Sequence, residues 1–416
     1  MRTSRSDVVI VGGGVIGLCT AYYLHRKGAS VVVLDQNGMG RGASYGNAGL
    51  IVPSHIIPLA SPGALEQGLR WLFRSDSPFY IKPQLRWDLV RWLWLFRKYA
   101  TEEHVRRSAP LLRDLLLASQ HLTEQITQEE AFDAEFQRNG LLMLYMQEKG
   151  RKECERLFQL AQEHDLPARM VEHIEEVLPD FSTPARGGLF FPEDAHLNPA
   201  KFVQGLYHVL EERGVRFRPE TPVTGFQVEG TRIRRVLTSR GGFASDEVVL
   251  AAGAWSFLLG KKIGLRIPVE PAKGYSLNFA RPARAPSIPL LLTEAKVAVT
   301  PLRETLRLAG TLELAGWDMS INRKRAEAIY QRARRYMPDV PFPSWEYITL
   351  WRGLRPASPD GLPVMGHTRK YSNLTLATGH AMIGMSLGAI TGKLMAELIA
   401  GETPEMDLHP FRLERF

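Results

Sequence analysis

Three glycines and one carboxylate near the N-terminus have the types and spacing needed to hold a dinucleotide. Gly12, Gly14 and Gly17 form the pattern G-x-G-x-x-G, and Asp35 follows 18 residues after the last of them. The first glycine of this pattern permits a tight turn, the second lets the backbone approach a pyrophosphate, and the third lets a helix pack closely on a strand. A carboxylate at the end of the next strand bonds a ribose hydroxyl, which favours an unphosphorylated ribose. The motif therefore indicates binding of FAD or NAD, without choosing between them.

A strand, a helix and a second strand have to position these residues. Residues 8–11 form a short continuous apolar run, as expected of a buried parallel strand, and residues 31–34 form a second one. The helix between them would direct its free N–H groups and the positive end of its dipole at the phosphates. We expect a Rossmann-like unit at the N-terminus.

Two later segments have small-residue loops of a similar kind. Residues 247–256, EVVLAAGAWS, run from a strand into small residues, beneath which a flat or charged group could lie. An ordinary strand-to-helix turn is the alternative. Residues 373–399 contain no Asp, Glu, Lys or Arg before Lys393, and they predict a strand, a glycine loop and a helix over about 385–400. The N-terminus of that helix would offer free N–H groups to an electron-rich acceptor, or the helix packs on the sheet, or both.

Composition argues against several other classes. The chain of 416 residues has a formal net charge of +8, but no dense basic block and no zinc-finger spacing, so we expect no nucleic-acid partner. Cys19 and Cys154 have no His or Cys neighbours at ligand spacing, which predicts neither a disulfide framework nor a metal site. Residues 42–65 carry no charge, yet three prolines interrupt them, so we do not expect them to span a membrane.

The rest of the chain interleaves helical and strand patterns without repeats or linkers. Residues 64–137 are helical in pattern, with apolar residues close to one face of 109–126. Helices are also expected at 148–164, 199–213 and 322–337, and antiparallel strands at 268–279, 290–300 and 306–314. Because the two kinds of segment alternate, the chain does not divide into two simple halves.

Together these motifs resemble the D-amino-acid oxidase superfamily of FAD-dependent oxidoreductases over nearly the whole chain. The segments that carry the likeness are, in order, GGGVIGLCTAYYL, GASYGNAGLI, VVLAAGAWS, WRGLRPASPDGLPVMG and ATGHAMIGMSLGAITGKLMAELI. The first is shared by many flavoproteins, whereas the second and fourth, in this order, are more specific. The likeness is closest to bacterial D-amino-acid dehydrogenases, with glycine oxidase and sarcosine oxidase more distant.

The resemblance implies a fold of α/β class with mixed α+β character. A Rossmann-like FAD-binding domain would comprise residues 1–60, 170–265 and 350–416, interleaved with an antiparallel-sheet substrate domain and helical insertion at 61–169 and 266–349. FAD would be bound non-covalently, since neither cysteine lies in the C-terminal half, where some relatives attach flavin. The residues implied in cofactor binding are Gly12, Gly14, Val15, Ile16, Asp35, Gln36, Arg41, Gly42, Ala43, Ser44, Asn47, Ala48, Gly49, Leu50, Val223, Ala252, Gly253, Trp255, Gly353, Arg355, Gly379, His380, Ile383, Gly384, Met385 and Ser386.

The resemblance also implies that Arg355 binds the carboxylate of an amino-acid substrate. A guanidinium offers two parallel donors to a carboxylate and so fixes both its position and its tilt. Arg352 is the alternative partner, and a surface arginine that caps a turn is the simpler interpretation of Arg355. Tyr275 and His55 are the other candidate catalytic residues, more as orienting groups than as proton carriers. Little acid–base machinery is needed, because the Cα hydrogen can pass as hydride to flavin N5.

The expected activity is oxidative deamination of D-amino acids to 2-oxo acids and ammonia, with electrons passed to a quinone or another non-oxygen acceptor. A glycine/sarcosine-type oxidase, a (hydroxy)proline dehydrogenase and a catalytically silent FAD-binding subunit stay open as alternatives. Residues 87–100 mix Trp, Leu and Arg, so peripheral contact with the membrane is a hypothesis beside that of a core-packing helix. The first apolar run is too short for a secretory signal, so we expect a cytoplasmic protein, peripheral at most on the inner face of the cell membrane.

Overall fold

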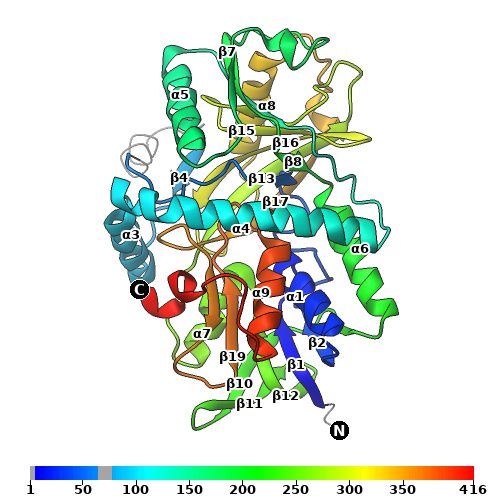
Figure 1. Ribbon diagram of the computed structural model, residues 1–416, viewed down its shortest axis with the longest axis vertical. Helices are drawn as coiled ribbons and strands as arrows, with labels where there is room; N and C mark the ends of the chain where they lie inside the picture. The colour runs from blue at the N-terminus through cyan, green and yellow to red at the C-terminus, as the bar shows by residue number, and fades with distance from the viewer. Residues whose placement is uncertain (1–4, 64–76) are drawn as a thin grey trace.

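The computed structural model describes residues 5–63 and 77–416, which form two large sheets with a long helix between them (Figure 1). Helix α4 (Glu102–Glu129) crosses the molecule, with the sheet of β1 on one side of it and the sheet of β13 on the other. The predicted α/β class of mixed character is confirmed. Part of the expected helical segment 64–137, residues 64–76, lies outside the described residues.

The first sheet has a parallel centre, in which β1 lies between β2 and β12, with β9 and β19 outside them. Antiparallel β10, β11 and β18 extend it. Among the described residues its strands are β1 (Arg5–Val11), β2 (Val31–Leu34), β9 (Arg216–Arg218), β10 (Val223–Glu229), β11 (Arg232–Thr238), β12 (Gly241–Leu250), β18 (Val364–His367) and β19 (Leu374–Thr378). Apolar clusters cover both faces of β1, which explains why residues 8–11 are continuously apolar.

The second sheet is mainly antiparallel, as expected, with parallel pairing only of β5 with β14 and of β4 with β16 among the described strands. Helix α8 (Arg323–Tyr336), capped by Asn322, packs on one face. Its strands are β4 (Phe79–Ile81), β5 (Leu141–Tyr145), β6 (Arg169–Val171), β7 (Gly187–Phe191), β13 (Glu270–Ala280), β14 (Leu290–Leu292), β15 (Val297–Pro301), β16 (Thr305–Leu314) and β17 (Thr349–Ala357). A two-stranded ribbon, β3 (Leu50–Ile51) with β8 (Ala195–His196), lies apart from both sheets.

Three strands belong to a different sheet from the one that the expected domain ranges imply. Strand β7 falls wholly within 170–265, and β6 and β17 fall within 170–265 and 350–416 apart from their first residues, yet all three pair in the second sheet. The cause is that sheet membership depends on pairing with distant strands, here β5 and β13, which local sequence does not reveal. The division into two domains otherwise stays a prediction.

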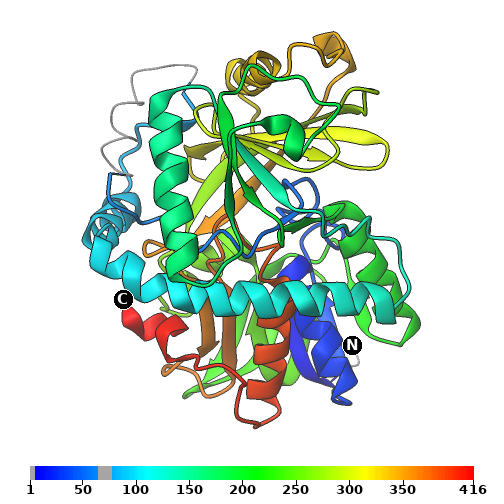
Figure 2. The same ribbon diagram turned by 45° about the horizontal axis from the view of Figure 1, so that its top comes forward.

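The helices follow their capping residues closely. Helix α6 (Pro199–Glu212) starts after Asn198, whose side chain accepts from Lys201 N, and ends before Gly214, with φ +86°, as predicted. Helix α4 buries most of the predicted apolar face, from Leu112 to Ile126, and lies across the molecule in Figure 2. In the described part of the chain the other helices include α3 (Trp87–Tyr99), α5 (Glu148–Glu163), α7 (Ser256–Lys262) and short 3-10 segments such as η2 (Gly253–Trp255). None of the described helices is long and apolar enough to cross a membrane.

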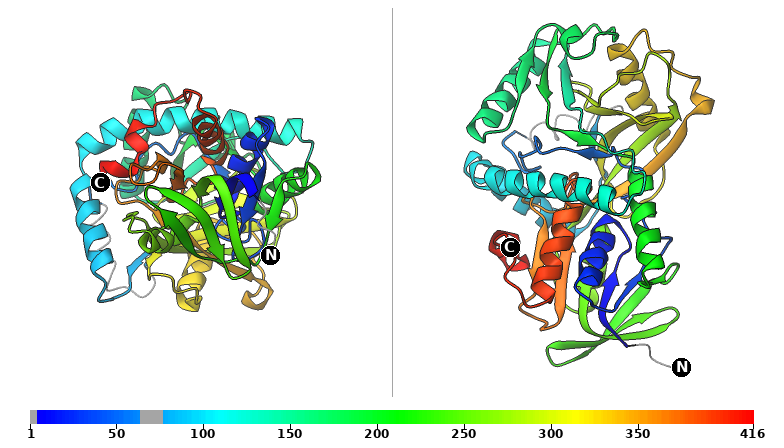
Figure 3. Two further views of the ribbon diagram at one scale, coloured as in Figure 1. Left: turned by 90° about the horizontal axis from the view of Figure 1, so that it is seen from below. Right: turned by 45° about the vertical axis from the view of Figure 1, so that its right-hand side comes forward.

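The last helix, α9 (Gly388–Ile399), begins later than expected. A loop over 380–387 precedes it, with turns such as Ile383 N to His380 O, so the helix starts at Gly388 and not near Met385. Helix α9 runs beside α1 (Val15–Arg26), as Figure 3 shows. Their close approach needs Gly392, because a Cβ there would lie 2.4 Å from the backbone carbon of Cys19.

Candidate active site

The glycine turn between β1 and α1 leaves no room for side chains. Gly12 has φ +114°, and a Cβ on it would lie 2.3 Å from Ala251 O. A Cβ on Gly17 would lie 1.9 Å from Gly12 O, so that position also requires glycine. The turn therefore presents bare backbone at the start of α1, where a phosphate is expected to bind.

Asp35 is held at the end of β2 by backbone donors. Gly13 N donates to its Oδ2 (2.8 Å) and Asn37 N to its Oδ1 (2.7 Å). Burial nevertheless raises the pKa of this carboxyl, against the lowering effect of those two hydrogen bonds. Each carboxylate oxygen keeps a further lone pair, so Asp35 can still accept from a ribose hydroxyl.

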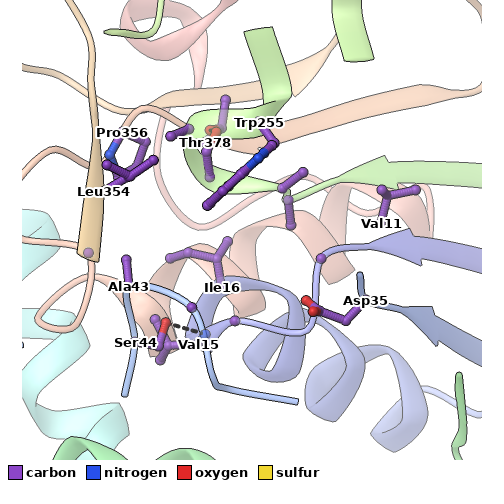
Figure 4. Close-up of a pocket in the computed structure, with 18 of the residues that line it drawn as sticks. Val11, Val15, Ile16, Asp35, Ala43, Ser44, Trp255, Leu354, Pro356 and Thr378 are labelled. Carbon is purple, nitrogen blue, oxygen red and sulfur yellow. Dashed lines mark hydrogen bonds between the residues drawn. The ribbon is translucent and has the colours of Figure 1, made fainter. Parts of the chain in front are cut away.

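Ser44 joins the loop over residues 42–49, which we call the cofactor loop, to the start of α1. Its Oγ accepts from Val15 N (3.0 Å), the dashed line in Figure 4. A Cβ on Gly14 would lie 3.2 Å from the same oxygen, so the loop and the glycine turn are in close contact. The small residues of this loop are those expected to lie along a dinucleotide.

These elements enclose a cavity of about 310 Å³ that runs from Asp35 to Arg355. In Figure 4, Trp255 projects across it toward Ile16, and Leu354 and Pro356 lie on the side opposite Asp35. The implied cofactor residues that line it are Gly12, Gly14, Val15, Ile16, Asp35, Gln36, Gly42, Ala43, Ser44, Asn47, Val223, Ala252, Gly253, Trp255, Arg355, His380, Gly384 and Met385. The structure thus brings together segments that are hundreds of residues apart in the chain.

Arg355 reaches this cavity from β17. Its guanidinium lies over Gly274, where a Cβ would be 2.0 Å from Nη1, and Nη1 donates to Thr311 O (3.0 Å). Thr311, a β-branched residue with φ +65°, lies where the β13–β16 register shifts, which turns its carbonyl toward the arginine. Among the described residues Arg355 has no carboxylate partner, and desolvation lowers its pKa to about 10.

Arg352, the alternative partner, projects from the opposite face of β17. Its Nε donates to Met319 O (2.6 Å), and it does not line the cavity. Of the two arginines, only Arg355 has donors available to a ligand in the cavity.

Tyr275 and His55 do not line the cavity either. Tyr275 lies on the α8 side of β13, where its hydroxyl donates to Glu313 (3.0 Å) and accepts from Asn322 N (3.1 Å). His55 contacts Ser54 Oγ through Nδ1 (3.2 Å), and burial lowers its pKa to about 4. Neither side chain contacts this cavity, and a role for Tyr275 or His55 in orienting a substrate stays a prediction.

The remaining implied cofactor residues do not line the cavity. Ser386 links two of the segments, because its Oγ donates to Leu50 O (2.9 Å) and accepts from Val52 N (3.3 Å). Arg41 is exposed, and Gly379 has φ +76° at the entry to the C-terminal loop. The residues of this group are Arg41, Ala48, Gly49, Leu50, Gly353, Gly379, Ile383 and Ser386.

Sequence reasoning did not identify several residues at the site. Helix α7 contributes Leu258, Leu259 and Lys262 to the cavity wall, although its short segment carries no motif. Arg307 of β16 is also buried, and its Nη1 donates to Asn47 O of the cofactor loop (2.7 Å). An arginine between Leu306 and Leu308 of a strand was the available signal for Arg307.

The fold and site are those of a flavin-dependent oxidoreductase, and the chain belongs to the family DAO, FAD dependent oxidoreductase, whose model matches residues 7–398. It is similar to D-amino acid dehydrogenase of Paramagnetospirillum magneticum, with 33% identity over 98% of this chain and 98% of that protein. It is similarly related to D-amino acid dehydrogenase of Granulibacter bethesdensis, with 32% identity over 98% of this chain and 99% of that protein. Among solved structures it resembles glycine oxidase from Geobacillus kaustophilus, with TM-score 0.81 and 24% identity over the full length of both chains.

FAD is the cofactor, and the cavity residues fit it. The bare turn at Gly12 and Gly14, the carboxylate of Asp35 and the small residues of the cofactor loop follow one another along the cavity, as an extended dinucleotide requires. Cys19 is buried between α1 and α9, and Cys154 is buried in α5. Both are therefore away from the cavity lining.

Proposed function

We propose that this protein oxidises D-amino acids to 2-oxo acids and ammonia, using non-covalently bound FAD. The observation that carries the proposal is Arg355, a guanidinium without a carboxylate partner among the described residues, at one end of a dinucleotide cavity. A desolvated guanidinium of this kind needs an anion, and the α-carboxylate of an amino acid provides one in bidentate geometry. Two relatives with the name D-amino acid dehydrogenase, aligned over nearly the whole chain, support the same substrate class.

The residues of the chain position the reactants and supply little proton chemistry. Bound FAD would supply the acceptor for the Cα hydrogen as hydride, and water would then hydrolyse the imino acid to a 2-oxo acid and ammonia. Arg355 holds the carboxylate so that Cα faces the cofactor. His380, whose Nε2 contacts Thr391 Oγ1 (3.0 Å), is neutral, because burial lowers its pKa to about 3. It adds no charge at the cavity and serves to position the loop.

The cofactor contacts are part of the same proposal. Gly12–Gly17 would hold the pyrophosphate, Asp35 would bind the ribose, and the cofactor loop and the loop that begins at Gly379 would hold the flavin. The FAD-binding domain then comprises the first sheet with its helices, and the substrate domain comprises the second sheet, including β6, β7 and β17.

We further propose that the electrons go to a quinone or another non-oxygen acceptor and that α3 touches the membrane surface. Trp87 and Trp94 of α3 are 87% and 64% exposed, and Leu85 and Val90 are exposed beside them. Arg91, Arg97 and Lys98 are exposed on the same helix. An exposed Trp-rich face with basic residues suits the interface of an anionic bilayer. The location that fits is cytoplasmic, peripheral on the inner face of the cell membrane.

Steady-state assays test this function against its alternatives. The holoprotein is assayed with D-amino acids, glycine, sarcosine, proline and hydroxyproline, each with oxygen or with a redox dye as acceptor. The proposal expects turnover of D-amino acids with the dye and little with oxygen. Turnover confined to glycine and sarcosine with oxygen would instead identify a glycine/sarcosine-type oxidase, and turnover confined to cyclic imino acids a (hydroxy)proline dehydrogenase.

A further inference from the structure

Two glycines face each other across strands β13 and β17. Gly274 pairs with Gly353 in the antiparallel register. A Cβ on Gly274 would lie 2.0 Å from Arg355 Nη1, and a Cβ on Gly353 would lie 2.3 Å from Cη2 of Trp351. Both distances are far below van der Waals contact. The space of the two missing side chains is therefore filled by two planar groups, a guanidinium and an indole, that lie flat on the sheet.

The guanidinium and the indole are neighbours on the same face of the sheet. Directly paired residues of an antiparallel sheet project to one face, with Cβ positions about 5 Å apart. Arg355 covers one of these two positions and Trp351 covers the other. A carboxylate bonded to Arg355 would therefore have the indole beside it.

Trp351 is also in contact with the cofactor loop. A Cβ on Gly46 would lie 2.4 Å from Cδ2 of the indole, so this ring is held between β17 and the loop. The loop itself is anchored on either side of Gly46, by Ser44 at Val15 N and by Asn47 O at Arg307. Trp351 is partly exposed and does not line the 310 Å³ cavity, so it borders the space next to Arg355 outside that cavity. Because backbone confines the ring from two sides, the indole cannot easily move away from a ligand.

From this geometry we propose that Trp351 determines substrate specificity by limiting the size of the substrate's side chain. The inference rests on the function proposed above, in which Arg355 binds the substrate carboxylate. With the carboxylate on the guanidinium, Cα and its side chain lie next to the confined indole. Small side chains fit in front of the ring, and bulky ones meet it.

The first test compares kcat/KM for D-phenylalanine and D-alanine in the wild-type protein and in Trp351→Ala, with a dye as acceptor. The ratio of the two values should rise about 10-fold or more in the variant, because a wall made by one large side chain is removed. Leu350→Ala is the matched control, since Leu350 precedes Trp351 on β17 and packs in the core on the opposite face. Its ratio should stay within about 2-fold of the wild-type ratio.

Binding without turnover separates failure of this inference from failure of the proposed function. Acetate and benzoate are titrated into the holoprotein, and their Kd values are read from the flavin absorption spectrum. Trp351→Ala should shift the Kd ratio toward benzoate, even if no amino acid is turned over. Gly353→Ala, whose added Cβ displaces the indole without removing it, should shift both ratios in the same direction.

Trp351→Phe replaces Trp351→Ala if the latter does not retain flavin, with a smaller shift expected. Unchanged substrate and carboxylate ratios in flavin-loaded Trp351 and Gly353 variants would overturn the inference. Equal shifts in Leu350→Ala would also overturn it, because the effect would then come from general loosening of β17. If carboxylate ratios shift while no amino acid is oxidised, the proposed function is wrong and the inference about the wall stands.

Discussion

Arg355 and Arg352 lie three residues apart on β17 and have opposite surroundings. Arg355 reaches the dinucleotide cavity, whereas Arg352 bonds the carbonyl of Met319 on the other face. Alternation along a strand predicts that two residues at this spacing face opposite ways. The sequence does not say which face meets the cofactor, and only the pairing of β17 with β13 distinguishes the two arginines.

Replacing Arg355 by Leu should lower kcat/KM for a D-amino acid by about 100- to 1000-fold, because two charge-assisted hydrogen bonds to the substrate are lost. FAD should stay bound, and the melting temperature should not fall, because the guanidinium makes one hydrogen bond and no ion pair among the described residues. Steady-state kinetics measure kcat/KM, and thermal unfolding measures the melting temperature. Arg352→Leu is the matched control and should change kcat/KM by less than about 3-fold. If the Arg352 variant loses activity and the Arg355 variant does not, the roles assigned to the two arginines are reversed.

The sequence does not reveal whether the side chains of Tyr275 and His55 face the site. Tyr275 was a candidate orienting residue, but whether a strand residue faces the site depends on its place in the alternation of side chains along the strand. In the structure Tyr275 shares the α8 side with Leu277, and its hydroxyl is taken up by Glu313. Glycine motifs were more informative, since their role depends on local backbone geometry.

At the scale of elements, the second sheet anchors the cofactor loop. Arg307 Nη1 donates to Asn47 O (2.7 Å) and its Nε to Asn278 Oδ1 (2.6 Å), while Thr300 Oγ1 donates to Ala48 O (2.7 Å). These bonds connect the loop that approaches FAD to strands β13, β15 and β16. Loop position is therefore coupled to the sheet that carries Arg355.

Arg307→Met should weaken FAD binding by about 10-fold, although Arg307 does not line the cavity, because the Asn47 carbonyl and the Asn278 amide oxygen lose their buried donor. Kd is measured by titrating the apoprotein with FAD and following flavin fluorescence. Arg303→Met is the control, because Arg303 is largely exposed and pairs with Asp133. An unchanged Kd in Arg307→Met would show that the loop does not depend on this anchor.

A buried carboxyl group, that of Asp194, connects the segments next to strands β3 and β8. Asp194 accepts from Ser54 N (3.1 Å) and Ser54 Oγ (2.5 Å). Burial raises the pKa of Asp194 to about 7, and these hydrogen bonds only partly offset that effect. The carboxyl therefore titrates near neutral pH in the folded protein and near pH 4 in the unfolded chain.

This shift predicts a pH dependence of stability. Between about pH 4 and pH 7 the folded protein keeps a proton on Asp194 that the unfolded chain has released, so the stabilisation falls as pH rises and levels off above about 7. Asp194→Asn should reduce the drop in melting temperature between pH 5 and pH 8 by a few degrees. Burial also raises the pKa of Glu247 to about 7, so some dependence of the melting temperature on pH should remain in this variant. Asp407→Asn, at an exposed turn, serves as control, and an unaltered slope in Asp194→Asn would contradict the assignment.

Helix α3 is firmly attached through its inner face. Trp92 Nε1 donates to Ala357 O of β17 (2.9 Å), and Arg86, the residue before the helix, forms a bidentate ion pair with Glu270 of β13. The outer face, with Trp87 and Trp94, has no such contacts in the part of the chain that is described. Both hypotheses for residues 87–100 thus have a basis, core packing on one side and membrane contact on the other.

Flotation with anionic liposomes at low salt tests the outer face of α3. The wild-type protein should float with phosphatidylglycerol vesicles and do so less at high salt, because screening weakens the attraction of its basic residues. The double variant Trp87→Glu, Trp94→Glu should stay at the bottom of the gradient. Tyr347→Glu, which alters an aromatic that is exposed on a different segment, should float like the wild type. Wild-type protein that does not float would remove the membrane proposal.

At the scale of the whole molecule, the class of the fold and the cofactor unit were predictable, whereas the allotment of strands to sheets was not. Strands β1 and β2 and helix α1 are adjacent in sequence, so a continuous apolar run and a glycine turn define them locally. Strands β6, β7 and β17 join the second sheet through β5 and β13, which lie far away in the chain. Long-range pairing also decides that Arg307 meets the cofactor loop, and no pattern in the sequence reports it.

We propose that the chain is a FAD enzyme that takes electrons from D-amino acids bound at Arg355. The most direct test is anaerobic mixing of the flavin-loaded protein with single amino acids while the visible flavin absorption is recorded. A D-amino acid should bleach the flavin and its L-enantiomer should not, and Arg355→Leu should need a far higher concentration of the D-amino acid. No bleaching by any D-amino acid, glycine, sarcosine or cyclic imino acid would contradict the account and indicate a catalytically silent FAD-binding subunit.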